Sequence, residues 1–237
     1  MRQGLLYRHL EYREFSGWLN VNKPRGYRST KVVSVIKKIT GAKKVGHGGT
    51  LDPMATGVLP ICLNGATTQT EFLMDHSKTY LFNLTFGESR DTYDADGNTI
   101  NRNNLVPEAS ALESILSNFS GRIEQKPPSF SAIRIDGKRA YDLARRGIQL
   151  ELREREILIN SLKFNGFINS NTAQFLVDCG RGCYVRSLAV DIAGAVGALG
   201  YVSKLVRLRV GSLYATDSLE IAGLTPDNVA RNLIVYR

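Results

Sequence analysis

The stretch of sequence that decides the fold is Gly46-His47-Gly48-Gly49-Thr50-Leu51-Asp52-Pro53-Met54-Ala55-Thr56-Gly57-Val58-Leu59-Pro60. It holds one carboxylate, Asp52, among four glycines and two prolines, with His47 five residues upstream. Glycine lets the backbone approach a partner closely and proline fixes the shape of a loop, so Asp52 is a candidate nucleophile or base on a preformed loop. An Asp-Pro pair also begins many helices, with Asp as the N-cap, and the local pattern leaves both interpretations open.

Five further sequence blocks occur in a fixed order along the chain. They are GWLNVNKPRG at 17–26, KTY at 78–80, GESRDTYDADG at 87–97, PPSFSAIRIDGKRAY at 127–141 and CGRGCYVRS at 179–187. Together with the loop around Asp52, these blocks resemble the TruB family of tRNA pseudouridine synthases. The resemblance extends from residue 17 to about residue 187. It implies the pseudouridine synthase fold, an α+β fold in which a bent, mixed, mostly antiparallel sheet is flanked by helices and carries the active-site cleft across it.

The hydrophobic pattern independently favours an α+β fold, because the expected strands are joined mostly by hairpins with helices between them. Strands are expected at 17–22, 58–63, 80–86, 130–135, 157–167, 172–179 and 204–214. Helices are expected from a Ser29 cap to a stop at Gly41, and at 107–119, 141–146 and 185–199. In the strand at 80–86, Tyr80, Phe82, Leu84 and Phe86 fall on one face, which makes a purely structural core role the alternative for Tyr80.

The family resemblance implies that a uridine in the TΨC loop of tRNA, at position 55 of tRNA, is flipped out and isomerised to pseudouridine. It implies Asp52 as the nucleophile or electrostatic partner and Arg186 as the cation that keeps Asp52 ionised. Tyr80 is placed against the target uracil, where its phenol oxygen would accept the C5 proton through a shifted pKa. A surface residue at a helix start is the alternative for Arg186. The isomerisation has no net redox change, so no cofactor is expected.

The charge distribution adds candidates for RNA binding. The net charge is +9, and residues 1–50 alone carry +9, which suits a polyanion that passes the Asp52 loop. A basic face with no partner is the alternative. The RNA-binding candidates are Lys23, Lys31, Lys43 and Lys44, with His47 to fill the gap left by the flipped base and Tyr184 as a wall of the site. A second basic segment, 121–160, carries +3 around Lys138, Arg139, Arg145 and Arg146.

Other features of the sequence exclude several classes of protein. Three cysteines are too few for a disulfide framework, and Cys179 and Cys183 offer two ligands where a structural zinc needs four, so no metal is expected. The chain has neither an apolar run of 18 residues nor a secretory leader, so we expect a cytoplasmic protein with no membrane contact. We expect a monomer that binds the T arm of tRNA and needs no obligate protein partner.

The expected organisation is an N-terminal extension at 1–16, which has no recognised counterpart, and a catalytic domain at 17–237. Many members of the family carry a PUA domain after the catalytic domain. About 20 residues follow the last expected strand, too few for such a domain, so no PUA domain is expected.

Two alternative functions remain. One is a guide-dependent pseudouridine synthase of the dyskerin type, which relies on a C-terminal RNA-binding domain and protein partners. The other is an RNA chaperone that folds tRNA and whose catalysis is incidental, although intact Asp52, Tyr80 and Arg186 argue against binding alone.

Overall fold

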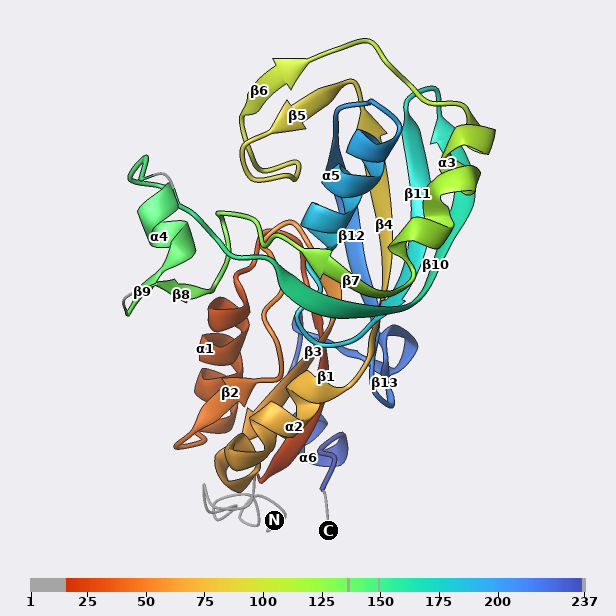
Figure 1. Ribbon diagram of the computed structural model, residues 1–237. Coiled ribbons are helices and arrows are strands. Elements are labelled where there is room, and N and C mark those ends of the chain that lie inside the picture. The colour runs from red at the N-terminus through yellow and green to blue at the C-terminus, as the bar shows by residue number, and fades with distance from the viewer. Residues whose placement is uncertain (1–15, 136, 149, 236–237) are drawn as a thin grey trace, which may run out of the picture. The chain divides into compact units, whose positions relative to one another are not determined.

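The computed structural model describes residues 16–135, 137–148 and 150–235. The described residues up to 75 and from 210 onward form one compact unit, and those from 76 to 209 form a second (Figure 1). Apart from Ser16, the expected N-terminal extension lies outside the described residues. The single catalytic domain at 17–237 stays a prediction.

The first unit is built on strands β1 (Gly17–Lys23) and β3 (Thr56–Leu63), which pair antiparallel from Gly17↔Leu63 to Lys23↔Gly57. The short strand β2 (Val45–His47) pairs antiparallel with β3, and β14 (Leu219–Glu220) pairs parallel with β1. Leu19, Val21, Leu59 and Ile61 are fully buried and form the core of this unit. The strands expected at 17–22 and 58–63 are therefore confirmed.

Helix α1 (Ser29–Thr40) ends where the sequence predicts, because Gly41 adopts a φ of 65° and its N–H donates to Lys37 O at 2.9 Å. Its start differs from the prediction. Arg28 occupies the N-cap position, and the Ser29 hydroxyl bonds to the backbone of Leu51 instead of capping the helix. The unit also contains elements that were not expected, namely the 3-10 helix Asn64–Gln69, α2 (Thr70–Asp75) and α6 (Pro226–Arg231).

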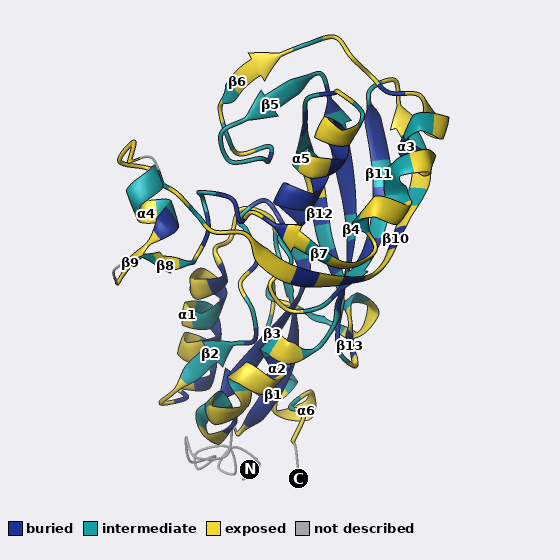
Figure 2. Cartoon of the chain, in the orientation of Figure 1, coloured by how far each residue is buried: buried dark blue, intermediate teal, exposed yellow. Residues whose placement is uncertain are grey.

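The second unit contains a sheet in the order β12-β4-β11-β10-β7, in which β4, β11, β10 and β7 pair antiparallel. Its strands are β4 (Lys78–Phe86), β7 (Gly121–Gln125), β10 (Arg155–Asn169), β11 (Thr172–Cys179) and β12 (Gly200–Val210). Tyr80, Phe82, Leu84 and Phe86 are all buried on one face of β4, as their alternation predicts, and Figure 2 shows β4 and β11 mostly buried.

Two helical segments cover this sheet. Helix α5 (Val185–Ala195) contacts β4, and α3 (Ala109–Ile115), continued by the 3-10 turn Leu116–Phe119, contacts β10; the two helices also contact each other (Figure 1). The helix expected at 107–119 is thus shorter and changes to 3-10 geometry. The helix expected at 185–199 ends at Ala195, since Gly197 turns the chain with a φ of 72°.

The remaining segments are short. The strand expected at 130–135 is only β8 (Arg134–Ile135), which pairs antiparallel with β9 (Lys138–Arg139); Asp136, between them, lies outside the described residues. Helix α4 (Ala140–Ala144) follows it, and β5 (Glu88–Arg90) and β6 (Thr99–Arg102) form a separate, unexpected hairpin. The strand expected at 204–214 is β12 followed by β13 (Leu213–Tyr214).

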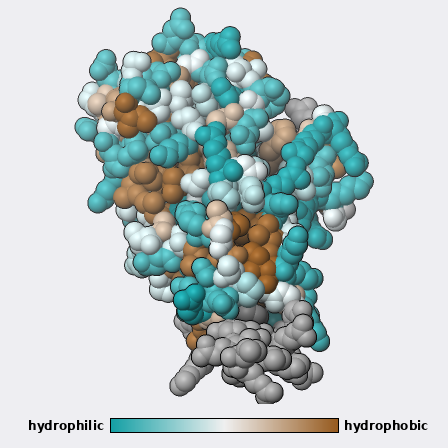
Figure 3. Space-filling model, turned by 180° about the vertical axis from the view of Figure 1, so that it is seen from behind, coloured by the Kyte–Doolittle hydropathy of each residue, from teal (hydrophilic) through white to brown (hydrophobic). Residues whose placement is uncertain are grey.

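The pairings described above are mostly antiparallel, and β1 pairs parallel with β14, which confirms the mixed α+β class. In the view of Figure 3, hydrophilic residues cover much of the described surface and hydrophobic residues form separate patches. In the parts of the chain that the structure describes, no helix is long and apolar enough to cross a membrane.

Candidate active site

Asp52 lies in the loop that joins β2 to β3. Because β2 and β3 pair directly, with His47 opposite Ile61, both ends of the loop are fixed by the sheet. Asp52 and Pro53 do not begin a helix: the chain makes a tight turn in which Ala55 N donates to Asp52 O at 3.1 Å. Asp52 is half-buried, so its carboxylate is carried by a loop of defined shape, as the loop interpretation predicts.

A buried lysine, Lys23, fixes the backbone of this loop. Lys23 is fully buried, and its ammonium donates to the carbonyl oxygens of Pro24, Tyr27 and Pro53 at 3.0, 2.7 and 3.2 Å. Gly26 N donates to the same Pro53 oxygen at 2.7 Å. Lys23 was predicted to bind RNA. Its ammonium is instead directed to the backbone next to Asp52, because a buried cation needs such acceptors.

The loop is also fixed on its other side. The Ser29 hydroxyl accepts from Leu51 N at 2.9 Å and lies 3.1 Å from Leu51 O, which ties the first turn of α1 to the residue before Asp52. A Cβ at Gly48 would lie 2.8 Å from Leu73 Cβ, so only glycine fits there. Gly48 thus serves close packing at the base of the loop.

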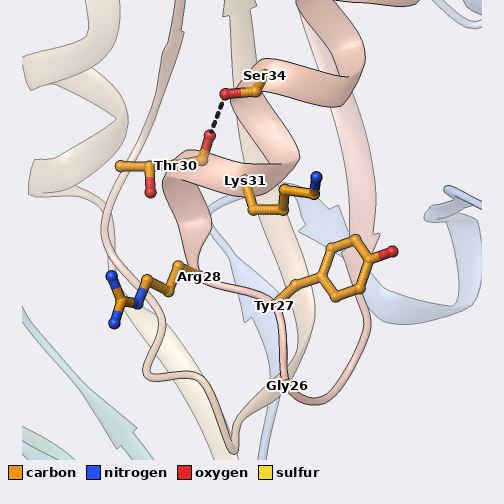
Figure 4. Close-up of a pocket in the computed structure, with 6 residues that line it drawn as sticks. All are labelled: Gly26, Tyr27, Arg28, Thr30, Lys31 and Ser34. Atoms are coloured by element: carbon orange, nitrogen blue, oxygen red, sulfur yellow. Dashed lines mark hydrogen bonds between the residues drawn. The ribbon is translucent and has the colours of Figure 1, made fainter.

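The candidate RNA-binding residues of the first unit lie near this loop in the sequence. His47 is half-buried at the end of β2, whereas Lys31, Lys43 and Lys44 are exposed. Lys31 lines an open groove between the turn after β1 and the start of α1, and Figure 4 shows its side chain on the same side as that of Tyr27, with Arg28 extending to the other side. The RNA-binding roles of His47 and these three lysines stay predictions.

Arg186 lies in the first turn of α5 and is buried, so the surface alternative is wrong. Its guanidinium forms an ion pair with the carboxylate of Asp94 at 3.7 Å and donates to the carbonyl oxygens of Thr92 and Phe130, each at 2.9 Å. A cation near a helix N-terminus is opposed by the helix dipole, and these acceptors compensate for that. Arg186 is therefore held in one orientation.

Asp94 is a site residue that the sequence analysis did not single out. It is buried, and its Oδ1 accepts from Thr92 Oγ1 at 2.6 Å and from Asp96 N at 3.1 Å, which leaves Oδ2 for Arg186. Tyr93 adopts a φ of 64° to form this turn. The available signal was an acidic cluster in the block at 87–97, but four acids within nine residues gave no reason to choose Asp94.

Tyr80 lies on β4 with its side chain almost completely buried. Burial raises the pKa of Tyr80 to about 12, with a smaller rise from Cys179 and Cys183 and an opposing effect of Arg207, whose guanidinium hydrogen-bonds the phenol. The phenol is therefore protonated at neutral pH. The shift is opposite to what a resting proton acceptor needs, so a role at C5 requires Tyr80 first to lose its own proton.

Tyr184, the predicted wall residue, immediately precedes α5 and is half-buried. The side-chain amide of Gln125 holds its backbone, accepting from Tyr184 N at 2.8 Å and donating to Tyr184 O at 3.1 Å. Among the described residues, no three His, Cys, Asp or Glu side chains are grouped closely enough to hold a metal ion.

The second basic segment surrounds α4. The guanidinium groups of Arg139 and Arg145 lie 6.0 and 5.7 Å from the ring centre of Tyr141, within the range of cation–π contacts. Lys138, Arg139 and Arg146 also line a groove here.

The structure thus places Tyr80, Tyr184 and Arg186 in the second unit, and Asp52, His47 and the candidate lysines in the first. Cys183 acts electrostatically on Tyr80 and directly precedes Tyr184 in the sequence. The pairing of Asp52 with Arg186 stays a prediction.

The candidate site therefore has three main features: a buried arginine–aspartate pair, an almost fully buried tyrosine, and an aspartate on a loop fixed by hydrogen bonds. The family model for the TruB family pseudouridylate synthase (N terminal domain) matches residues 37–185. This match covers more than half of the chain, and the chain belongs to the TruB family of pseudouridylate synthases.

Curated relatives agree with this assignment. The chain is 47% identical over 196 residues to tRNA pseudouridine synthase B of Ehrlichia ruminantium (strain Gardel), which covers 82% of this chain and 66% of that protein. It is 43% identical over 212 residues to the Brucella ovis protein of the same name, with 90% and 65% covered. The chain therefore spans about two thirds of the length of these relatives.

Solved structures share the fold. The crystal structure of a Cbf5-Nop10-Gar1 complex matches with a TM-score of 0.69 and 29% identity, covering 92% of this chain and 56% of that chain. An H/ACA RNP bound to a substrate RNA containing 2'-deoxyuridine matches with a TM-score of 0.66 and 27% identity, covering 92% and 55%.

Proposed function

We propose that this chain converts a uridine in the T arm of tRNA, at position 55 of tRNA, into pseudouridine. Family membership supports the reaction class, and the relatives at 43–47% identity, named tRNA pseudouridine synthase B, support tRNA as the substrate. The observation that carries the proposal is Asp52 on a loop held by Lys23 and Ser29, because a single carboxylate acts on a sugar or base only if its position is fixed.

The proposed reaction breaks the bond between the ribose and uracil N1, turns the base, and joins the ribose to C5. Asp52 is the nucleophile or electrostatic partner in this exchange, and Arg186 keeps Asp52 ionised. Tyr80 and Tyr184 contact the flipped uracil, and His47 fills the space that the base leaves.

The phosphates of the tRNA are contacted by three exposed lysines, Lys31, Lys43 and Lys44. The alternative RNA footprint is the basic segment that contains Lys138, Arg139, Arg145 and Arg146.

A guide-dependent activity is the second candidate, because the two solved structures described above, one of them an H/ACA RNP, share the fold. Their identity of 27–29% is well below that of the tRNA pseudouridine synthase B relatives, which favours action on tRNA without a guide. The proposed enzyme is a cytoplasmic monomer that needs no protein partner.

The test is to incubate the purified chain with an unmodified tRNA transcript and to map pseudouridine by carbodiimide labelling and primer extension. We expect a single stop, one nucleotide 3′ of position 55 of the tRNA, with no guide RNA present. A transcript with cytidine at that position is the matched control. Modification that requires an added guide RNA would favour the second candidate, and no modification in either case would contradict both.

A further inference from the structure

Arg207 is a second buried arginine beside the proposed site, and the reaction as derived above does not use it. Its side chain is only 1% exposed, and its guanidinium hydrogen-bonds the Tyr80 phenol. Two contacts fix β12 against β4 on either side of this pair: Thr85 Oγ1 donates to Ser203 Oγ at 2.7 Å, and Arg209 Nε donates to Thr79 Oγ1 at 3.0 Å. The two contacts run in opposite order along the strands, so Tyr80 and Arg207 are held within an antiparallel pair.

A buried guanidinium remains charged, because the pKa of arginine lies far above neutral pH. Removing it from water is costly unless it stabilises a negative group or is well hydrogen-bonded. The groups that act on the Tyr80 phenol are Arg207 on β12, Cys179 on β11 and Cys183 in the following turn. Among these groups Arg207 favours the phenolate, while burial and both thiols oppose it.

The chemistry of the proposed reaction requires one proton to move. Uracil C5 carries a hydrogen before the isomerisation and N1 does not, whereas in pseudouridine N1 carries the hydrogen and C5 does not. One group can make both transfers if it starts protonated, gives its proton to N1, and later takes the proton from C5. The protonated Tyr80 fits this order, provided that its phenolate is stabilised between the two steps.

We propose that Arg207 is a positioning residue that fixes the phenol oxygen of Tyr80 and stabilises its phenolate while the proton moves from C5 to N1. Tyr80 donates its hydroxyl proton to N1 after the glycosidic bond breaks. The phenolate, hydrogen-bonded by Arg207, then takes the proton from C5 after the new carbon–carbon bond forms, which restores the phenol. The inference rests on the proposed function and names the residue that makes Tyr80 suitable for it.

The test compares single-turnover rates at saturating tRNA for Arg207→Met and Arg207→Lys. Arg207→Met is expected to lower the rate by about 100-fold, as loss of one preorganised charge-stabilising donor does in other enzymes. Arg207→Lys keeps the charge and is expected to stay within about tenfold of the parent. The tRNA dissociation constant is expected to remain within about twofold in both variants, because binding rests on phosphate contacts.

A more acidic phenol separates this role from a structural one. With 3-fluorotyrosine at position 80, Arg207→Met is expected to regain about tenfold in rate. The fluorine makes the phenol more acidic, so the phenolate forms more easily without the charge of Arg207. Arg209→Met is the matched control. The guanidinium of Arg209 lies on the same strand but contacts Thr79 instead of Tyr80, so 3-fluorotyrosine should not change the rate of this variant. Thermal unfolding followed by circular dichroism shows whether each variant is folded.

A parental rate in Arg207→Met, or a loss that 3-fluorotyrosine does not relieve, would overturn the inference. If Arg207→Met does not fold, the smaller loss in Arg207→Lys must respond to 3-fluorotyrosine in the same way, and a lack of response overturns the inference. These outcomes leave the proposed function intact as long as the parent forms pseudouridine. A parent that forms none contradicts the proposed function itself.

Discussion

At the scale of single residues, Asp52 is the carboxylate on which the proposed chemistry depends. We expect Asp52→Asn to abolish turnover and to leave tRNA binding within about threefold of the parent, because binding rests on phosphate contacts and catalysis on the carboxylate. Single-turnover assays beside filter binding check this. Residual activity within about tenfold of the parent would remove Asp52 from the mechanism, since loss of a nucleophile costs far more.

Arg186 has a geometry that a lysine cannot reproduce. Its guanidinium reaches one carboxylate and two carbonyl oxygens at once, those of Asp94, Thr92 and Phe130. We expect Arg186→Ala to cost nearly as much activity as Asp52→Asn, and Arg186→Lys to restore it only in part, because an ammonium lacks the planar fork.

Stability must be measured together with this activity. Arg186→Ala leaves the buried Asp94 without the charge it faces, and removal of one member of a buried ion pair typically destabilises a protein by about 3–5 kcal/mol. Rates are therefore compared at a temperature where circular dichroism shows each variant folded. Full turnover in the Arg186→Lys variant would show that Arg186 is not an orienting partner.

At the scale of elements, the Asp52 loop depends on close packing between β2 and α2. A Cβ at Gly48 would lie 2.8 Å from Leu73 Cβ, whereas one at Gly46 meets only Thr70 Oγ1 at 3.7 Å. We expect Gly48→Ala to destabilise the protein by about 1–3 kcal/mol through overpacking. Gly46→Ala is the matched control and should change stability by less than about 0.5 kcal/mol. Urea denaturation measures both, and equal effects would contradict the packing argument.

Asp178 on β11 joins that strand to β4, β10 and β12 in the second unit. Its carboxylate accepts from Thr79 Oγ1 and Asn160 Nδ2, each at 2.7 Å, and pairs with Arg209. Partial burial raises the pKa of Asp178, but the hydrogen bonds and the Arg209 charge outweigh burial, so the pKa is lowered overall.

A lowered pKa of a folded carboxyl predicts a specific pH dependence of stability. The unfolded chain binds more protons at Asp178 than the folded chain, so the stabilisation is complete above about pH 4 to 5 and is lost as the pH falls through the folded pKa. We expect the free energy of unfolding to fall more steeply below pH 5 in the parent than in Asp178→Asn. Urea denaturation at several pH values measures this. The exposed Asp217→Asn should keep the parental slope, and a parental slope in Asp178→Asn would contradict the assignment.

The elements that the sequence predicts well are those with long periodic patterns. In β4 and in α1 a single face is buried, and the spacing of the apolar residues along the sequence shows this directly. The roles of Ser29 and Lys23 could not be predicted, because their partners, Leu51 and Pro53, are set by tertiary contacts. Asp94 was missed for the same reason: only the fold shows which acid of its loop faces Arg186.

At the scale of the whole molecule, the first unit is discontinuous in sequence. Strand β1 pairs with β14 through Val21↔Leu219 and Asn22↔Glu220, and Trp18 exchanges backbone hydrogen bonds with Ile234. Two-residue strands such as β14 carry no periodic signal, so their partners nearly 200 residues away are invisible in the sequence. The residues proposed for catalysis, by contrast, lie inside sequence blocks that can be recognised, and this is why the family could be predicted before the arrangement of the chain.

The uneven charge of the molecule predicts how its affinity for RNA depends on salt. Residues 1–50 carry +9, and Lys31, Lys43 and Lys44 are exposed there. If about six phosphates are contacted, log K against log salt should have a slope near −4 to −5, at roughly −0.7 to −0.9 per contact.

Neutralising Lys31, Lys43 and Lys44 together to Gln should flatten this slope by about 2 to 3 units, while the single-turnover rate at saturating tRNA changes little. The matched control neutralises three exposed cations elsewhere, Lys163, Lys204 and Arg231, and should keep the parental slope. Filter-binding titrations at several salt concentrations measure all three proteins. An unchanged slope in the first variant would move the RNA footprint to the exposed basic segment around α4, where Lys138, Arg139, Arg145 and Arg146 are the next residues to neutralise.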